Sequence, residues 1–384
     1  MVYRKDSDDF VINDTPLGSD SQQYAYNPEM IEIGLEPTLR LTRDLKNAAS
    51  ELGEAEARYL VDYYYQWQKA RTRAANVARS YQDESIAPGV EPHAIVNWLQ
   101  SNTVSIERMI RGTLDVYSNS KIEGQWARSI IGIGPIISAG LLAHIDIRKA
   151  ETAGAIWRFA GLDPTNSWLG KEKSEVMVNE IVGTGRRNNI SYDNFVELGR
   201  LSHRRPDDLV KQSFQMKKNY EGDNSLDDLT KTDVINALAK RPWNADLKTL
   251  CWKIADSFVK FQNNPNDVYG KVYVERKAYE HRINEAGGYA ERAAEKLRTT
   301  NIRKPEVRRT YESGKLTDGH IHASAMRVAV KLFLAHYHHV CYEAVLGETP
   351  PKPYVIDRGD HTHFISPPNW PMTTLRPGIL NVAD

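Results

Sequence analysis

The stretch from Ser129 to Ile145 constrains the fold more than any other part of the sequence. It consists of an apolar segment, the sequence Gly-Ile-Gly-Pro at 132–135, and a second apolar segment. Glycine can adopt positive φ and lets another backbone approach closely, and we expect both Gly132 and Gly134 to use this freedom. Pro135 suits the first position of a helix, where an N–H group would have no intrahelical acceptor. The pattern predicts two helices joined by a tight turn.

Such a turn also predicts a binding site. The N–H groups at a helix N-terminus, together with the helix dipole, favour an anion such as a phosphate. The pattern is typical of a helix-hairpin-helix that grips the DNA backbone, and the candidate contacts are Gly132, Ile133, Gly134 and Pro135. The sequence leaves open the alternative that this is only a tight turn between two core helices.

Helical periodicity extends over most of the remaining chain. From Glu54 to the Pro88-Gly89 break, apolar residues repeat in heptads, and a second helix follows from about Pro92 to Tyr117, so we expect an antiparallel coiled-coil-like pair. The heptad positions of the first helix are Leu60, Tyr63, Trp67, Ala70, Ala74, Val77 and Tyr81. Amphipathic helices are predicted at 247–261 and 268–286, and the most apolar helix at 319–346. The body is therefore predicted to be all-α, with irregular N- and C-terminal arms.

Charge and composition divide the chain into four parts. The 384 residues carry 50 Lys and Arg against 50 Asp and Glu, but residues 1–56 hold 5 of the former and 12 of the latter. We expect an acidic extended arm at 1–53 with a short helix near 39–52, the helical pair at 54–118, a helical domain at 119–346, and a Pro-rich tail at 347–384. A polar, irregular insertion is expected at about 165–240. The arm either shields a basic surface or acts as a solubilising tail.

Several classes of protein are disfavoured by the sequence. Cys251 and Cys341 both lie in apolar helical patterns, which favours reduced core residues over a disulfide. No apolar run has the length of a membrane span, and the first residues do not resemble a signal peptide. We therefore expect a cytoplasmic protein that does not contact a membrane.

Basic clusters are further candidates for phosphate contacts, although a run of charge is often only a solvated face. These residues are Arg186, Arg187, Arg204, Arg205, Arg303, Lys304, Arg308 and Arg309. Near the C-terminus, the imidazoles of His361 and His363 and the carboxylate of Asp360 form a donor set suited to a divalent metal. The alternative is a polar surface turn, so no cofactor is implied beyond this possible metal.

Three segments together resemble the C-terminal transposase domain of the Piv invertase type, found in insertion-sequence enzymes with a DEDD nuclease domain. The segments are 131–143 with the Gly-Ile-Gly-Pro turn, Trp157-Arg-Phe-Ala-Gly-Leu-Asp-Pro164, and the helices from Leu247 to Ala335 with Gly314-Lys315 between them. The pair at 54–118 occupies the place of that family's coiled coil. The RuvC-like nuclease domain is absent from the pattern, because the arm of about 50 residues is too short and too polar to form one. The family's nucleophilic serine has its nearest counterpart in Ser167, at a shifted position.

The resemblance implies a transposase-derived protein that binds the backbone of DNA or structured RNA. Two alternatives stay open. One is a DNA strand-transfer enzyme that uses Ser167 with a nuclease partner supplied in trans. The other is a structural or inhibitory scaffold that forms a homo-oligomer through the helical pair.

Overall fold

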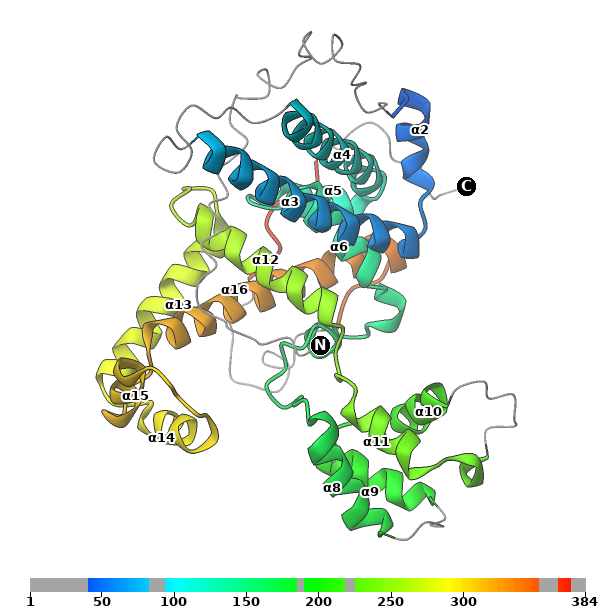
Figure 1. The fold of residues 1–384 in the computed structure, drawn as a ribbon, viewed down its shortest axis with the longest axis vertical. Coiled ribbons are helices and arrows are strands. Elements are labelled where there is room, and N and C mark those ends of the chain that lie inside the picture. Colours follow the sequence, from blue (N-terminus) through cyan, green and yellow to red (C-terminus); the bar gives the residue numbers. More distant parts are fainter. Residues whose placement is uncertain (1–40, 83–93, 185–189, 218–224, 352–364, 374–384) are drawn as a thin grey trace. The chain divides into compact units, whose positions relative to one another are not determined.

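The structure is a computed structural model that describes residues 41–82, 94–184, 190–217, 225–351 and 365–373. Within these ranges every regular element is a helix, which confirms the all-α prediction (Figure 1). The chain divides into two compact units, one formed by residues 1–48 and 62–113 and the other by 49–61 and 114–384. The predicted domain boundaries are not tested by this division and stay predictions.

The first unit is built on two long helices, α3 (Glu54–Gln82) and α4 (Ala94–Asn119), which also extend into the second unit. Two short helices, α2 (Arg43–Asn47) and η2 (Ala48–Glu51), precede them, close to where one was expected. Inside the unit, Nε of Arg71 donates to the buried carboxylate of Glu107 at 2.6 Å.

The face of α3 that is buried differs from the predicted heptad stripe. Tyr64 is buried and hydrogen-bonds Glu107, whereas Trp67 is only half-buried and Val77 is 39% exposed. Tyr64 lies one residue, or about 100°, around the helix from the predicted position Tyr63. Tyr64 and Arg71, the polar partners of Glu107, must face α4. This requirement rotates α3 so that its buried face differs from the predicted apolar stripe.

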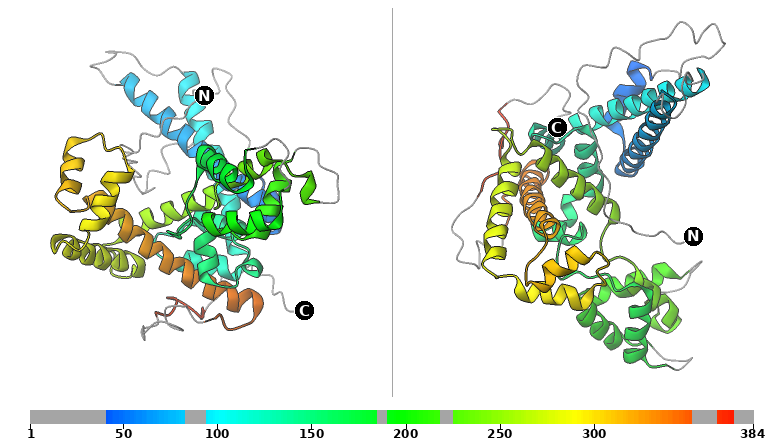
Figure 2. Two further views of the ribbon diagram at one scale, coloured as in Figure 1. Left: turned by 90° about the horizontal axis from the view of Figure 1, so that it is seen from below. Right: turned by 60° about the vertical axis from the view of Figure 1, so that its left-hand side comes forward.

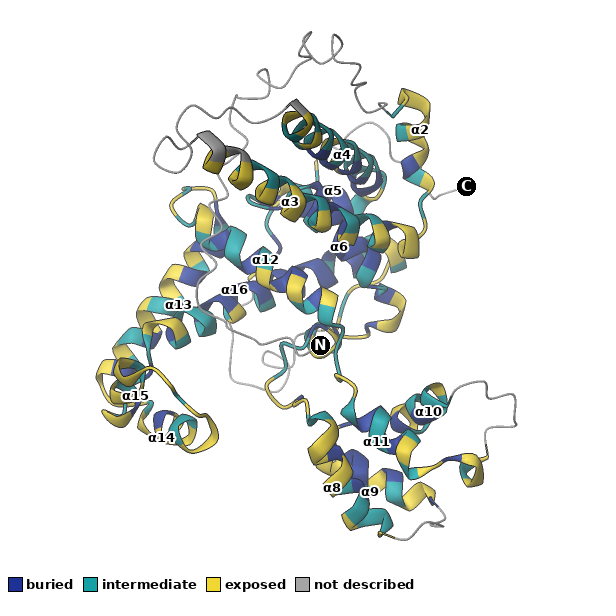
Figure 3. Cartoon of the chain, viewed as in Figure 1, coloured by how far each residue is buried: buried dark blue, intermediate teal, exposed yellow. Residues whose placement is uncertain are grey.

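The second unit has a core formed by six helices whose apolar faces meet (Figure 3). They are α5 (Ile122–Ser129), α6 (Pro135–His144), α7 (Ala153–Phe159), α12 (Ala245–Phe261), α13 (Val268–Glu285) and α16 (Asp318–Cys341). A 3-10 turn, η3 (Ile147–Lys149), follows α6, and a π-helical turn, η5 (Tyr342–Leu346), follows α16. Both Cys251 and Cys341 are buried and free, as the sequence predicted.

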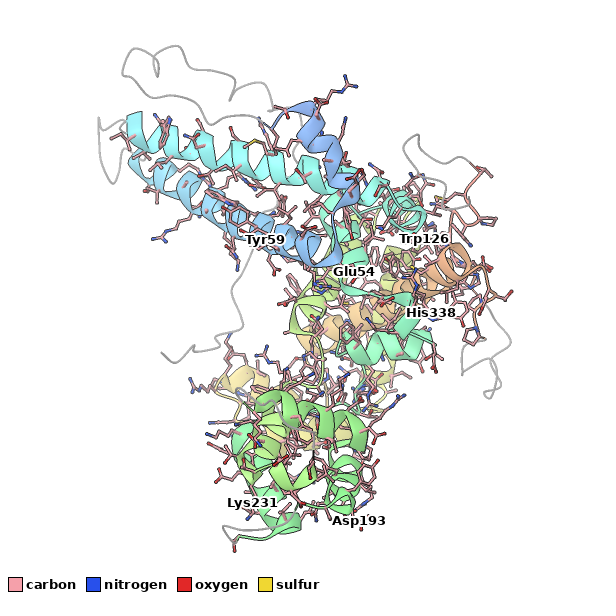
Figure 4. The ribbon with its side chains drawn as sticks, turned by 90° about the vertical axis from the view of Figure 1, so that its right-hand side faces the viewer. Glu54, Tyr59, Trp126, Asp193, Lys231 and His338 are labelled. Carbon is pink, nitrogen blue, oxygen red and sulfur yellow. The ribbon has the colours of Figure 1, made fainter. Side chains whose placement is uncertain are left out.

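Aromatic rings occupy the centre of this core. Trp126, which Figure 4 labels on α5, stacks on Phe333 of α16 with ring centroids 5.8 Å apart. The ring of Phe258 from α12 lies 4.8 Å from that of Tyr269 from α13. His338, also labelled there, donates from Nε2 to the carbonyl of Ala150 at 2.9 Å.

The described residues between 170 and 239, here called the 170–239 bundle, form helices around their own apolar core, which corrects the expectation of an irregular insertion. Its helices are α8 (Gly170–Val182), α9 (Tyr192–Ser202), α10 (Pro206–Met216), η4 (Leu226–Asp228) and α11 (Lys231–Ala239). Val178, Phe195 and Leu198 are fully buried within it. The helices are short and separated by polar loops, so the apolar repeat is interrupted before it becomes conspicuous in the sequence. Capping boxes at Ser191 and Thr230 begin α9 and α11.

Arg204 belongs to the interior of this bundle, which also corrects a prediction. Its guanidinium donates to the carbonyls of Ala237, Leu238 and Lys240 at 2.9, 3.0 and 2.7 Å, and the residue is 9% exposed. Desolvation, aided by the charge of Arg158, lowers the pKa of Arg204 to about 10. The guanidinium satisfies the last carbonyls of α11 and is not available to a phosphate.

A smaller helical hairpin, α14 (Ala290–Thr299) and α15 (Pro305–Glu312), lies at the end of α13 and the start of α16 (Figure 2). The amide of Asn284 on α13 both donates to and accepts from the backbone of Leu316, at 3.0 and 2.8 Å. Nearby, the buried carboxylate of Glu280 accepts hydrogen bonds from Arg276, Tyr289 and Ser324. This carboxylate ties α13, α14 and α16 together.

The described part of the tail, residues 365–373, has no regular structure and is fixed by side chains of the core. The indole of Trp126 donates to the carbonyl of Pro368 at 2.8 Å, and the indole of Trp370 donates to Glu343 at 2.7 Å. Nε2 of His336 donates to the carbonyl of Ile365 at 2.9 Å. In the described ranges, no helix has both the length and the apolar character needed to span a membrane.

Replacing Glu280 by Gln should destabilise the protein in a pH-dependent manner. Burial raises the pKa of this carboxyl, but hydrogen bonds from Tyr289, Arg276 and Ser324 outweigh that effect and hold the pKa below its usual value. The ionised form is therefore stabilised by folding, fully so above the pKa of the unfolded chain at about 4.3. We expect a loss of about 1–3 kcal/mol in urea unfolding at pH 7. The difference between the two proteins should shrink as the pH falls below about 4; a constant difference would contradict the assignment.

Replacing Arg204 by Met should destabilise the 170–239 bundle by about 1–3 kcal/mol, because three buried carbonyls lose their donor. Hydrogen exchange of the α11 amides should become faster, while the core helices α12 and α16 keep their protection. The neighbouring Arg205, which is exposed, provides the matched control. Equal exchange in the Arg204→Met and Arg205→Met proteins would show that the guanidinium has no structural role.

Candidate nucleic-acid interface

The α5–α6 turn uses its first glycine as predicted. Gly132 has φ +85°, and a Cβ at this position would lie 2.6 Å from Oγ of Ser257 on α12. The same hydroxyl donates to the carbonyl of Gly132 at 2.7 Å. A side chain at this position would therefore meet both backbone strain and a clash, and Gly132 fastens the turn to α12.

The second glycine behaves differently from the prediction. Gly134 has φ −92° and ψ −179°, an extended conformation that any residue adopts, and a Cβ at this position would have no neighbouring atom within 4 Å. Pro135 occupies the first turn of α6 as expected, and no side chain caps this helix. Ile133 is buried in the core. The turn therefore has one face on α12 and one open position, Gly134, at the uncapped start of α6.

A pocket of about 300 Å³ lies beside this turn. The turn contributes residues 129–131, the start of α13 contributes Asn266, Val268 and Tyr269, and the tail contributes Pro368 and Asn369. The amide of Asn369 donates to the carbonyl and the hydroxyl of Ser129, each at 3.2 Å. The tail thus fixes the end of α5 beside the turn.

The basic residues Arg303, Lys304, Arg308 and Arg309 lie within α15 and just before it, and all are exposed. Arg308 forms an ion pair with Glu312 at 2.8 Å. Arg205, at the N-cap of α10, is also exposed but belongs to the 170–239 bundle. These cations are accessible to an anionic ligand, in contrast to Arg204.

The structure does not bring the turn and the α15 cations together. The start of α13 lines the pocket beside the turn, whereas its last turn, through Asn284, contacts the chain that leaves α15. An 18-residue helix is about 27 Å long, so the two candidate regions are separated by roughly the length of α13. One small ligand cannot reach both, but a nucleic acid can.

A row of cations that was not predicted from the sequence lies on α7, α14 and α16. Arg327 and Lys331 are four residues apart and share one face of α16. Arg292 of α14 lies near Arg327, and Arg158 of α7 lies near Asp163, which in turn faces Lys331. The spacing of Arg327 and Lys331 is visible in the sequence, but the contribution of α7 and α14 depends on tertiary packing.

In this cation row, formed by Arg158, Arg292, Arg327 and Lys331, the charge of Arg292 acts on Arg327 and the charge of Arg327 acts on Lys331. Desolvation lowers the pKa of Lys331, and the charge of Arg327 lowers it further, while Asp163 opposes the shift. Desolvation and Arg292 lower the pKa of Arg327 in the same manner. The pKa of His320, one turn before Ser324, is lowered by desolvation and by Arg292, Arg327 and Lys296. The positive forms of Arg327 and Lys331 are thus disfavoured, and an anion placed beside them would relieve this cost.

The remaining predicted site residues do not add a further site in the described part of the chain. Arg186, Arg187, Asp360, His361 and His363 lie outside the described residues. Within the described ranges, no three His, Cys, Asp or Glu side chains gather in an arrangement that could hold a metal ion.

Ser167 lies exposed in the loop between α7 and α8. The nearby carboxylate of Asp163 accepts from the backbone and hydroxyl of Thr165, at 2.9 and 2.7 Å. Nothing in this loop tests the predicted role of Ser167 as a nucleophile.

Comparison with known proteins gives one match. The model of a family described as Transposase IS116/IS110/IS902 family matches residues 125–179, which comprise most of α5, the turn, α6, α7 and most of α8. Neither the curated proteins nor the solved structures contain a match. The matched segment includes the turn at 132–135 and Arg158 of the cation row, and it supports a transposase-type domain in this part of the chain.

Proposed function

We propose that the protein is a transposase-derived DNA-binding protein that holds the DNA backbone on the cation row of α7, α14 and α16. The observation that carries the proposal is geometric: Arg327 and Lys331 share one face of α16, and Arg292 of α14 lies near Arg327. Like charges brought together on rigid helices cost free energy in the unbound protein. A row of phosphates offsets that cost and releases counterions.

The start of α6 would form a second contact with the backbone. Its first N–H groups have no intrahelical acceptors, no side chain caps them, and Gly134 leaves the approach open. A further contact would be made by the exposed cations within and just before α15, near the C-terminal end of α13. They are Arg303, Lys304, Arg308 and Arg309. All of these groups recognise phosphate and not base edges, so the binding would depend on backbone and shape and would weaken with salt.

The family match supports this proposal because it falls on the segment that carries the turn and α7. Strand transfer through Ser167 is not part of the proposal.

The double variant Arg327→Gln/Lys331→Gln should bind duplex DNA about ten-fold more weakly at low salt, because two phosphate contacts are lost. The slope of log affinity against log salt concentration should decrease in magnitude by about two. Fluorescence anisotropy with a labelled duplex over a salt series measures both quantities.

Lys69→Gln/Arg73→Gln is the matched control, since these residues are exposed, are also four apart on a helix, and remove the same charge. If both double variants bind alike, net charge alone governs the affinity and the cation row has no special role.

Gly134→Glu should weaken DNA binding by about ten-fold without loss of stability, since the position has ordinary φ and open space for a side chain. A carboxylate at the start of α6 competes with a phosphate for the same N–H groups. Gly134→Gln is the control, because it has the same shape without the charge. If Gly134→Glu binds DNA as the native protein does and has the same melting temperature, the turn is not part of the interface.

A further inference from the structure

Two loops that connect the 170–239 bundle with the core are bonded to each other along their length. One loop follows α7 and the other precedes α12. The N–H of Asn244 donates to the carbonyl of Phe159 at 2.9 Å, and the amide of Asn166 donates to the carbonyl of Pro242 at 3.3 Å. The indole of Trp168 donates to the carbonyl of Ala239 at 2.7 Å. These contacts make one ordered surface from residues 157–168 and 239–248, here called the loop platform.

Large aromatic rings are exposed on the loop platform. Trp168 is 50% exposed and Phe159 is 45% exposed. The hydrogen bond from Nε1 of Trp168 to Ala239 fixes how this ring is oriented, so its exposure does not result from a freely rotating side chain. Trp243 packs against the α carbon of Gly161, where a Cβ would lie 2.6 Å from the ring. The loops that carry the exposed rings are therefore well packed against each other.

Cations accompany these rings. The guanidinium of Arg241 lies over one face of the Trp168 ring, 5.1 Å from its centre, so that a base would stack on the opposite face. The ammonium of Lys248 lies over the ring of Trp243, 4.0 Å from its centre. Lys331, a member of the cation row, lies 5.2 Å from the ring centre of Trp157. Within 157–168 and 239–248 the cations are Arg158, Lys240, Arg241 and Lys248, and the acids are Asp163 and Asp246. The loop platform is thus both aromatic and positively charged.

We infer that the loop platform binds single-stranded nucleic acid by stacking an unpaired base on Trp168. Base stacking on a fixed indole, next to cations that hold the phosphates, is the combination by which single strands are bound without regard to sequence. Duplex DNA cannot use the ring, because its bases are already stacked in the helix. The positive charge favours a nucleic acid over an apolar protein segment as the occupant. The inference rests on the proposed function, since Arg158 belongs to both surfaces and Lys331 of the cation row lies over Trp157 of the loop platform.

The test compares a labelled strand of about 15 thymidines with a duplex of the same length, using fluorescence anisotropy on the full-length protein. Trp168→Ala should weaken binding of the single strand by about ten-fold and leave duplex binding within about two-fold. Trp168→Phe keeps an aromatic face and should retain most of the affinity. It also lacks the indole N–H, so a loss caused by the broken bond to Ala239 would affect both variants equally.

Trp252→Ala is the matched control, because this tryptophan is 53% exposed on α12, outside the loop platform. A strand of abasic residues with the same charge should bind the native protein and Trp168→Ala equally. The inference is overturned if Trp168→Ala binds thymidine strands like the native protein, or if it loses single-strand and duplex affinity by the same factor. Native protein that binds duplex but not single strand refutes the loop platform alone, whereas failure to bind either refutes the proposed function as well.

Discussion

The contacts of the Phe333 ring hold together the body on which every candidate site depends. This ring of α16 stacks with Trp126 of α5, and it meets the rings of Tyr269 and Phe258 edge-on at 5.3 and 5.5 Å. Four helices are thereby fixed around one side chain, with the geometry that aromatic pairs prefer. Lys331 lies two residues before Phe333, about 200° around the helix. The packing that buries Phe333 therefore also turns Lys331 to the side on which the cation row lies.

Polar groups inside this body are arranged so that little charge is buried. Desolvation lowers the pKa of His336 to about 4, so the imidazole is neutral near pH 7. With Nε2 donating to Ile365, Nδ1 accepts from the hydroxyl of Tyr269 at 2.8 Å. This neutral chain of hydrogen bonds joins α13, α16 and the tail. The carboxylate of Glu280 is a buried charge. It forms an ion pair with Arg276 at 2.7 Å and accepts hydrogen bonds from the hydroxyls of Tyr289 and Ser324, as a buried carboxylate requires.

The sequence predicted the long helices well and the polar segments poorly. Apolar repeats at 247–261, 268–286 and 319–346 correspond closely to α12, α13 and α16, because one face of each is buried against the core. The 170–239 bundle was missed because its helices are short and mostly polar outside. The role of Arg204 could not be predicted, since a pair of arginines gives no indication of which guanidinium will cap a helix. The prediction that the turn requires glycine is correct at Gly132, where α12 lies close. It is wrong at Gly134, where a Cβ would have no neighbouring atom within 4 Å.

The neutral total charge of the chain does not oppose a nucleic-acid interface, because electrostatic attraction acts over about 8–10 Å at moderate ionic strength. Residues 1–56 account for the excess of acid, and residues 57–384 carry 45 Lys and Arg against 38 Asp and Glu. Within that body the buried carboxylates of Glu107 and Glu280 are paired with cations or hydroxyls and so contribute little negative field outside. Arg327 and Lys331 each stand beside another cation, with Glu280 the acid that acts on Arg327 and Asp163 the acid that faces Lys331. The field that a ligand meets at α16 is therefore set by this local arrangement, and it is positive although the chain as a whole is neutral.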